Sequence, residues 1–435
     1  MSTSTVDHAV SNKLTPSPER GFYGWKLIGV LWFIYFLNMG FPLYGGAVIN
    51  TYMLKQIPMP RSIFGLGFTL LNLCIGVPSV LIAATILKWG IRRTFAIGSA
   101  LIFLGSMWMA FVASQPWHYL VGFGVLIGSG IGFGTMMPIS TVVTRWFKRY
   151  RGRAMAITLT ASGFAGLAGA PLMNKVLAAA AGNWQLAWEV VACASVLAAV
   201  VAHFAVKERP EDLGQDVDGI SSEAAAANPQ TDRGLVTKDE WTPGEAYRSP
   251  AFWIIFLGAI ACQFPFFFFT AHWILHLRGA GMSPANAALA MGLYTMGGIC
   301  GRLLAGPLLD RFAPRYVFML GLLLFIVGSV LAIQVTSSNL PVAFAAAILY
   351  GAGFGWSFVS ENTILANFFG AKIFPKLNGT LLLLAALVCS PAGIIGGKLF
   401  DVYRSYKPAF ELNEVLCVMG IVALAFARMP KRKIS

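Results

Sequence analysis

Charged side chains are scarce in this sequence. Asp, Glu, Lys and Arg together make up 11% of the 435 residues, whereas 57% of the residues are hydrophobic. A soluble globular chain carries roughly 25% charged residues, which cover its surface in water. The scarcity of charge therefore excludes an ordinary soluble domain and indicates that most of the chain lies in lipid.

Motifs for catalysis and for metal binding are lacking as well. The six cysteines fall in or at the ends of apolar runs and form no CxxC motif or Cys/His cluster. We therefore expect free thiols, no disulfide framework, no metal site and no cofactor. No nucleophile–base pair or phosphate-binding loop is found, which disfavours a membrane-embedded enzyme or sensor.

The net charge of +14 does not indicate a nucleic-acid partner, because the positive residues sit in short loops between apolar runs. Lys and Arg at such positions set the orientation of a membrane protein, and they favour the cytoplasmic side. Their asymmetry predicts a multi-pass protein of the cell membrane with both termini and the central linker in the cytoplasm. The polar first 24 residues give no sign of a cleavable signal peptide.

Apolar runs long enough to cross a bilayer, about 20 residues each, recur along the chain. The expected spans are 25–49, 62–87, 94–113, 117–144, 154–177, 186–206, 250–275, 284–309, 316–336, 341–367, 379–401 and 410–428. This pattern predicts an all-α membrane protein with twelve transmembrane helices. Its expected parts are an N-terminal tail (1–24), a six-helix bundle (25–206), a cytoplasmic linker (207–249), a second six-helix bundle (250–428) and a C-terminal tail (429–435).

The two expected bundles resemble each other. Gly130-Ile-Gly-Phe-Gly134 in the fourth span matches Gly351-Ala-Gly-Phe-Gly355 in the tenth. The loop after the second span, with Lys88, Arg92 and Arg93, matches the segment from Gly306 to Arg315 at nearly the same offset. Two matches in register predict pseudo-symmetric halves that derive from one ancestral unit.

These features resemble the major facilitator superfamily over nearly the full length of the chain. Gly306, Asp310 and Arg311 are similar to that family's loop motif, in which the aspartate latches helices together on the cytoplasmic side. The copy in the first half departs from the motif, because Leu87 replaces the aspartate and Ala83 the glycine. Arg92 and Arg93 keep its basic residues, and the resemblance implies the same gating role for them.

A narrower resemblance is to the monocarboxylate transporter and oxalate–formate antiporter branch. It rests on the stretch from His272 to Ser283 and on Gly301-Arg302 in the eighth span. The resemblance implies that Arg302 binds a substrate carboxylate. Lysines that the branch carries in the first or eleventh span are missing, and Leu43 stands at the first of these positions. A dicarboxylate would need two cations, so a substrate with one negative charge is favoured.

Arg302 and Glu361 are expected deep inside spans, where a charge costs about 2.5–3.5 kcal/mol. Arg302 lies eight residues before Asp310, and Glu361 lies at a similar depth in the tenth span, so the two side chains could meet. One hypothesis is a switch, in which Glu361 pairs with Arg302 and takes a proton when the substrate anion displaces it. The alternative is a fixed structural ion pair.

Other polar residues lie near the middle of spans, and each either contacts substrate or bonds a neighbouring helix. These candidates are Tyr35, Asn38, Asn72, Gln263, Tyr294, Tyr350 and Ser357.

The favoured function is alternating-access transport of a small monocarboxylate, coupled to protons as a symport, by a protein that we expect to be a monomer. An inside-negative potential opposes anion uptake by about 2.3 kcal/mol per charge per 100 mV, so uptake needs a co-moving proton or an exchanged anion. Glu361 favours the proton, and anion exchange is the second hypothesis. An exporter of lipophilic compounds with the same fold is the rival, and it would make Arg302 dispensable.

Overall fold

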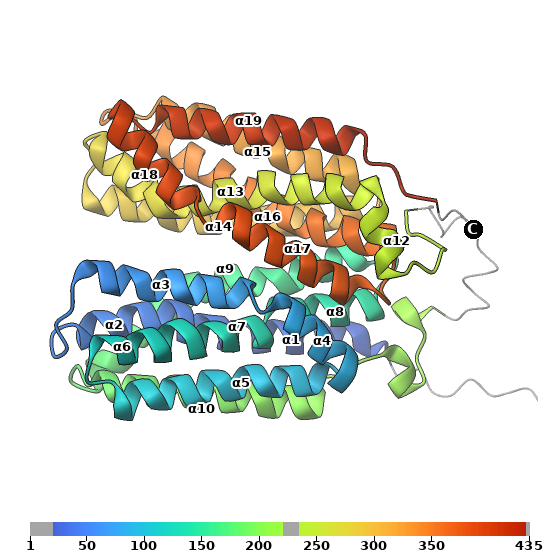
Figure 1. Cartoon of the computed structure of the whole chain (residues 1–435), viewed down its shortest axis with the longest axis horizontal. Helices are drawn as coiled ribbons and strands as arrows, with labels where there is room; N and C mark the ends of the chain where they lie inside the picture. The colour runs from blue at the N-terminus through green and yellow to red at the C-terminus, as the bar shows by residue number, and fades with distance from the viewer. Residues whose placement is uncertain (1–20, 221–234, 432–435) are drawn as a thin grey trace, which may run out of the picture.

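The computed structural model describes residues 21–220 and 235–431, and their regular structure is entirely helical. Twelve helical spans in these ranges are long and apolar enough to cross a membrane. They lie side by side in two groups, one from each half of the chain (Figure 1). The prediction of an all-α membrane protein with twelve spans is confirmed.

Several spans of the N-terminal half are built from more than one helical segment. In chain order the segments are α1 (Tyr23–Met39), η1 (Gly40–Gly45), α2 (Gly46–Met53), α3 (Arg61–Gly76), α4 (Ser79–Trp89), α5 (Ile91–Met107), η2 (Trp108–Val112), α6 (Pro116–Tyr119), η3 (Leu120–Ile127), α7 (Gly128–Gly134), α8 (Met136–Trp146), α9 (Arg151–Ala179) and α10 (Trp184–Ala205). The break between α3 and α4 falls at Pro78, which lacks the N–H that a continuous helix needs. Pro42 likewise interrupts the hydrogen bonding of an α-helix, and it lies in the π-helical η1.

The C-terminal half is more regular. Its helices are α13 (Pro250–Gly279), α14 (Pro284–Leu309), α15 (Pro314–Ile333), α16 (Leu340–Phe369), α17 (Phe374–Cys389), α18 (Ala392–Tyr403) and α19 (Lys407–Ala425). Pro391 separates α17 from α18 within one span. The described parts of the linker form two short turns of 3-10 helix, η4 (Pro210–Leu213) and η5 (Val217–Gly219), and α12 (Pro243–Arg248).

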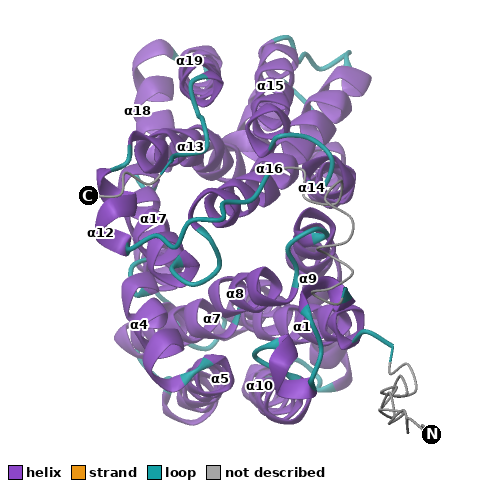
Figure 2. Ribbon diagram, turned by 90° about the vertical axis from the view of Figure 1, so that its right-hand side faces the viewer, coloured by secondary structure: helices purple, strands orange, loops and turns teal. Residues whose placement is uncertain are grey.

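Both described parts of the linker lie at one end of the bundle, together with the start of α1 and the end of α19 (Figure 1). We call this the linker end. Figure 2 looks onto it and shows the two halves meeting where α9 lies beside α14 and α4 beside α17. A hydrophobic cluster crosses between the halves there, joining Ala156 and Leu159 of α9 to Ala305 and Leu309 of α14.

Close helix packing places the central helix pair of the C-terminal half. At Gly351 of α16, a side chain would overlap the carbonyl oxygen of Tyr294 on α14. Gly355 lies equally close to the backbone of Gly298, one turn further along α14. These glycines let two helix backbones touch, and they thereby fix the position of Arg302 against α16.

Candidate functional site

Arg302 is buried in the middle of α14, with 4% of its surface exposed. Its guanidinium lies over the ring of Phe354 on α16, with 5.5 Å between Cζ and the ring centroid. Its Nε has no hydrogen-bond partner, and no ion pair reaches its side chain from the described residues. A buried cation with a weak aromatic contact and no acid keeps its capacity to bind an anion.

Aromatic side chains from both halves surround Arg302. Phe354 stacks on Phe266 of α13 with ring centroids 4.1 Å apart. Tyr35 of α1 and Tyr44 of η1 are within electrostatic range of the guanidinium, as is Tyr294 of α14. The hydroxyl of Tyr294 is buried and has no hydrogen-bond partner.

Phe354 and Tyr44 are site residues that the sequence pattern did not indicate. Phe354 is part of the repeated glycine motif of the tenth span, which predicts close packing and gives no hint of a contact with Arg302. Tyr44 lies in the π-helical η1, and this irregular segment moves its side chain away from the position that an α-helical count would give.

Glu361 lies on α16 with 1% of its surface exposed, but it does not pair with Arg302. Its Oε1 accepts a hydrogen bond of 3.4 Å from Nε2 of Gln263 on α13, and its Oε2 has no partner. Glu361 also lies within electrostatic range of Cys389 of α17. Its carboxyl group therefore faces α13 and α17, inside the C-terminal half, while Arg302 faces tyrosines of the other half.

Two other polar candidates bond to neighbouring helices. Asn38 of α1 donates from Nδ2 to the carbonyl oxygen of Gly134 at 3.0 Å and to Oγ of Ser99 at 3.3 Å. The hydroxyl of Tyr350 on α16 accepts a bond of 3.0 Å from Nδ2 of Asn413 on α19. Both side chains hold helices of their own half together.

The remaining two candidates also lie away from Arg302. Ser357 is fully buried on α16, and its hydroxyl packs close to Gly321 of α15. Asn72 is exposed on α3 and donates to the carbonyl oxygen of Phe68 in its own helix at 2.9 Å. Of the seven polar candidates, the structure therefore brings only Tyr35 and Tyr294 to Arg302.

Asp310 joins the two halves at the linker end. The backbone N–H of Gly152 donates to its Oδ1 at 2.7 Å, and that of Arg153 to its Oδ2 at 3.3 Å. Nε of Arg153 lies 3.2 Å from the same Oδ2. Gly306 permits this contact, because a side chain there would meet Ala156 of α9.

Burial raises the pKa of Asp310 to about 7, although the two backbone hydrogen bonds and Arg153 act in the opposite direction. Arg311, the next residue of the motif, is exposed. Asp310 is thus the member of the motif that carries the contact between the halves.

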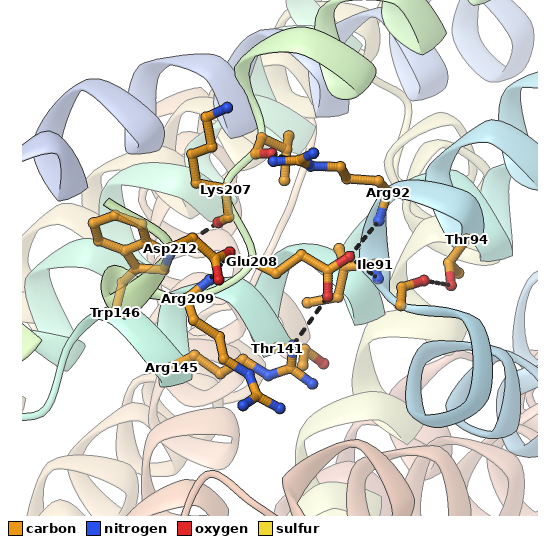
Figure 3. A network of polar contacts seen from close by, with 12 residues as sticks. Ile91, Arg92, Thr94, Thr141, Arg145, Trp146, Lys207, Glu208, Arg209 and Asp212 are labelled. Carbon is orange, nitrogen blue, oxygen red and sulfur yellow. Dashed lines mark hydrogen bonds and ion pairs between the residues drawn. The ribbon is translucent and has the colours of Figure 1, made fainter. Parts of the chain in front are cut away.

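A different acid occupies the corresponding end of the first half. Glu208, at the start of the linker, accepts hydrogen bonds from the backbone N–H groups of Ile91 at 2.8 Å and Arg92 at 3.2 Å, at the beginning of α5 (Figure 3). Its Oε2 lies 3.5 Å from Nη1 of Arg145 on α8. The side chain of Arg92 donates to the carbonyl oxygen of Val206 at 2.6 Å, and Arg93 is exposed. This network stays within the N-terminal half and its linker.

Two further bonds cross between the halves at the linker end. Nη1 of the buried Arg151 on α9 donates to Oδ1 of Asn367 on α16 at 2.6 Å. Oγ of Ser79 on α4 donates to the carbonyl oxygen of Gly379 on α17 at 2.7 Å. Together with Asp310, these contacts close the linker end.

Within the described ranges, no group of three or more His, Cys, Asp and Glu side chains is arranged to hold a metal ion. The site that the structure does build is Arg302 with its aromatic neighbours.

Comparisons with known proteins agree with this architecture. The family model described as "Major Facilitator Superfamily" matches residues 31–281 and 274–434. An MFS-type transporter of Escherichia coli, YhjX, named as uncharacterised, is 24% identical over 373 residues, which cover 85% of this chain and 86% of that protein. Monocarboxylate transporter 13 of Bos taurus is 26% identical over 352 residues, which cover 77% of this chain and 72% of that protein.

Solved structures show the same fold at lower identity. The proton:xylose symporter XylE aligns with a TM-score of 0.71 and 16% identity, over 93% of this chain and 95% of that one. The Escherichia coli fucose:proton symporter FucP aligns with a TM-score of 0.66 and 16% identity, over 93% and 98% of the two chains.

Proposed function

Because the chain belongs to the Major Facilitator Superfamily, we propose that this transporter carries a small monocarboxylate and binds its carboxylate at Arg302. The single observation that carries the proposal is the state of this arginine. Arg302 is buried in a membrane span, and no acid of the described chain neutralises it. Burying a cation costs several kcal/mol unless an anion offsets it, and a substrate carboxylate would be that anion.

The surroundings of Arg302 favour one negative charge on the substrate. Among the residues that the structure describes, the groups that act on its guanidinium are three tyrosines and a cysteine, with no second Lys or Arg. The phenol groups can donate hydrogen bonds to a carboxylate, and Phe354 and Phe266 offer an apolar surface to the rest of the molecule. Relatives named monocarboxylate transporters support the same substrate class.

We infer that transport proceeds by alternating access, in which the two halves open the site first to one side of the membrane and then to the other. The bonds of Asp310, Arg151 and Ser79 hold the linker end closed, so the site is reached from the opposite end in this conformation. We assign the linker end to the cytoplasm on the basis of its Lys and Arg residues. Both termini would then lie in the cytoplasm. We also propose that the protein acts as a monomer in the cell membrane.

Proton symport provides the driving force for uptake against the membrane potential. Glu361 is our assignment for the proton site, because it is a buried carboxyl group with one unpartnered oxygen on the same helix as Phe354. Its coupling to Arg302 would run through α16 and not through a direct ion pair. Exchange of one carboxylate for another is the alternative, and it needs no proton site.

Ligand-dependent thermal stability tests the anion site directly. The melting temperature of the purified protein is measured with a panel of monocarboxylates for the wild type, Arg302→Gln and Arg248→Gln. Arg248 is exposed in α12 and serves as the control for the same chemical change. A ligand of the folded state raises the midpoint by mass action.

We expect one or more acids to stabilise the wild type and Arg248→Gln but not Arg302→Gln. An equal response of both variants would show that Arg302 is structural, and the exporter of lipophilic compounds would then be the better hypothesis.

A further inference from the structure

The linker reaches back into the junction between α8 and α9. The carboxylate of Asp218, in η5, accepts hydrogen bonds from three consecutive backbone N–H groups. Lys148 donates to its Oδ2 at 3.1 Å, Arg149 to Oδ2 at 2.7 Å and Tyr150 to Oδ1 at 3.3 Å. One side chain from the linker therefore fixes the backbone of the whole loop that leads into α9.

Two further N–H groups of the same backbone donate to a different carboxylate. Tyr150 is the N-cap of α9, and its own side chain caps nothing. The N–H groups of Gly152 and Arg153 donate to Asp310 from the other half of the molecule. The first N–H groups of a helix have no partner inside it, and at the start of α9 two carboxylates, Asp218 of the linker and Asp310 of the other half, supply partners. We call the contacts of Asp310, Arg151 and Ser79, which join the two halves at the linker end, the gate.

The segment that carries Asp218 is itself anchored to the N-terminal half. The backbone N–H of Tyr23 donates to Oε1 of Gln215 at 3.0 Å, and Gly219 packs directly against the ring of Phe22. Asp218 has a φ of 62°, a left-handed conformation that few residues other than glycine adopt. The backbone is thus turned so that the carboxylate faces the loop.

The other described end of the linker touches the same gate from the opposite half. The N–H of Thr237 donates to the carbonyl oxygen of Asn367 at 2.8 Å, and Oδ1 of Asn367 accepts the bond from Arg151. One described end of the linker therefore contacts Asn367, which helps to hold the two halves together, and the other contacts the loop directly before Arg151, Gly152 and Arg153.

We propose that Asp218 is a positioning residue of the gate, which holds the start of α9 in the geometry that receives Asp310. In the open state Asp310 leaves Gly152 and Arg153, while Asp218 keeps the loop ordered so that the contact can form again. The linker thereby sets how readily the transporter closes at this end. This role goes beyond the proposed substrate, since it holds for any molecule that the transporter carries.

Charge alone would act in the opposite direction. The negative charge of Asp218 opposes ionisation of Asp310 and is one reason for the raised pKa of Asp310. Removing that charge would end the repulsion between the two side chains and would by itself favour the contact of Asp310 with the two N–H groups. Positioning predicts the reverse, a weaker contact, and an experiment can therefore separate the two effects.

Hydrogen–deuterium exchange of the full-length protein in lipid nanodiscs measures this contact at the backbone amides concerned. The variants are Asp218→Asn, Asp310→Asn and, as the control, Asp216→Asn. Asn tolerates the left-handed conformation of position 218, so the first substitution removes the charge without forcing the backbone to change. Asp216 is exposed in the same segment, and its side chain caps nothing.

We expect Asp218→Asn to speed exchange of the amides of residues 148–150 and also of Gly152 and Arg153, by about tenfold, the factor that one charge-assisted hydrogen bond contributes. Asp310→Asn should affect only Gly152 and Arg153, and Asp216→Asn none of them. Faster exchange confined to residues 148–150, or slower exchange at Gly152 and Arg153, would overturn the proposal. A uniform increase over all helices would overturn it too, because it would show general destabilisation.

Transport kinetics give a second readout, with the rate of proton-driven uptake followed for the carboxylate that stabilises the protein. Asp218→Asn should lower the maximal rate severalfold and leave the KM within about twofold, because the residue acts on the gate and not on the binding site. An unchanged maximal rate would contradict the assigned role.

Discussion

The carboxylate of Asp310, at the end of α14, accepts a hydrogen bond of 2.7 Å from the backbone N–H of Gly152, in the first turn of α9. The bond joins the two halves of the molecule at the point where the positive end of a helix dipole meets an acid. Leu87 stands at the matching position of the first half and has no carboxylate to offer. The gate is therefore asymmetric, with one acid latch and a bond from Ser79 on the other side.

The folded protein with its gate closed should lose stability as the pH rises to neutrality. The pKa of Asp310 is raised from 3.8 to about 7 in this conformation, so the folded, closed state holds a proton that the unfolded chain releases near pH 4. Between these values the closed state binds more protons, and its stability falls with rising pH until the loss is complete above about 7. We expect the melting temperature of the wild type to fall by about 2 °C more than that of Asp310→Asn between pH 5 and pH 8.

The control for this measurement is Asp310→Asn, which removes the carboxyl group and keeps the groups that face it. Arg153 and Asp218 both act on the carboxyl group of Asp310, and both are unchanged in this variant. A pH dependence that is the same in the wild type and in Asp310→Asn would assign the effect to other groups and contradict the prediction.

Glu208 should stabilise the N-terminal half without holding the two halves together. It caps the start of α5 and pairs with Arg145, and all of these residues belong to one half and its linker. Glu208→Gln should cost about 1 kcal/mol, as loss of a helix cap does, and lower the melting temperature by about 2 °C. Glu211→Gln, a neighbouring exposed change, is the control. An equal effect of the two substitutions would show that the cap contributes nothing.

The sequence predicts the twelve spans well because hydropathy depends only on composition along the chain. It also places Asp310 at a helix end, since the motif Gly306-Pro-Leu-Leu-Asp310-Arg311 is contiguous. It does not predict the partners of Asp218 and Glu208. The segment that contains these two residues has the composition of a polar linker. Composition carries no information about which helix ends a linker residue contacts.

The separation of Arg302 from Glu361 could not be predicted from the sequence either. Counting residues along α14 and α16 gives their distance from the membrane surface, but it does not give the direction in which each side chain points around its helix axis. In the structure Phe354, and not Glu361, faces Arg302 from α16. Glu361 is turned toward Gln263, so equal depth did not bring the two charges together.

Gly351 should be intolerant of any side chain, because the backbones of α14 and α16 touch there. A Cβ at this position would overlap the carbonyl oxygen of Tyr294, whereas one at Gly292 would meet nothing within 4 Å. Overpacking typically costs about 1–3 kcal/mol. Gly351→Ala should therefore lower the melting temperature by several degrees, while Gly292→Ala should leave it unchanged or raise it, since alanine favours a helix by about 1 kcal/mol over glycine. Similar values for the two variants would show that the helices can separate without cost.

Glu361→Gln should uncouple transport from protons while leaving substrate binding intact. The carboxyl group of Glu361 contacts Gln263 and lies away from Arg302, so an amide of the same size preserves the packing but cannot take up a proton. In proteoliposomes, uptake driven by an imposed proton gradient should fall by a factor on the order of 100 or more, the scale on which a positioned proton-transfer group contributes. Exchange of labelled for unlabelled substrate, which needs no net proton movement, should persist.

The matched control for this experiment is Glu411→Gln, which removes an exposed carboxylate that pairs with Lys407. It should keep both proton-driven uptake and exchange. If Glu361→Gln retains proton-driven uptake, Glu361 is a structural residue, and anion exchange becomes the mechanism to test. If it loses exchange as well, the carboxyl group is needed for the movement of the two halves, because binding at Arg302 does not involve it directly. The comparison of gradient-driven uptake with exchange therefore separates the proton site from the anion site within one variant.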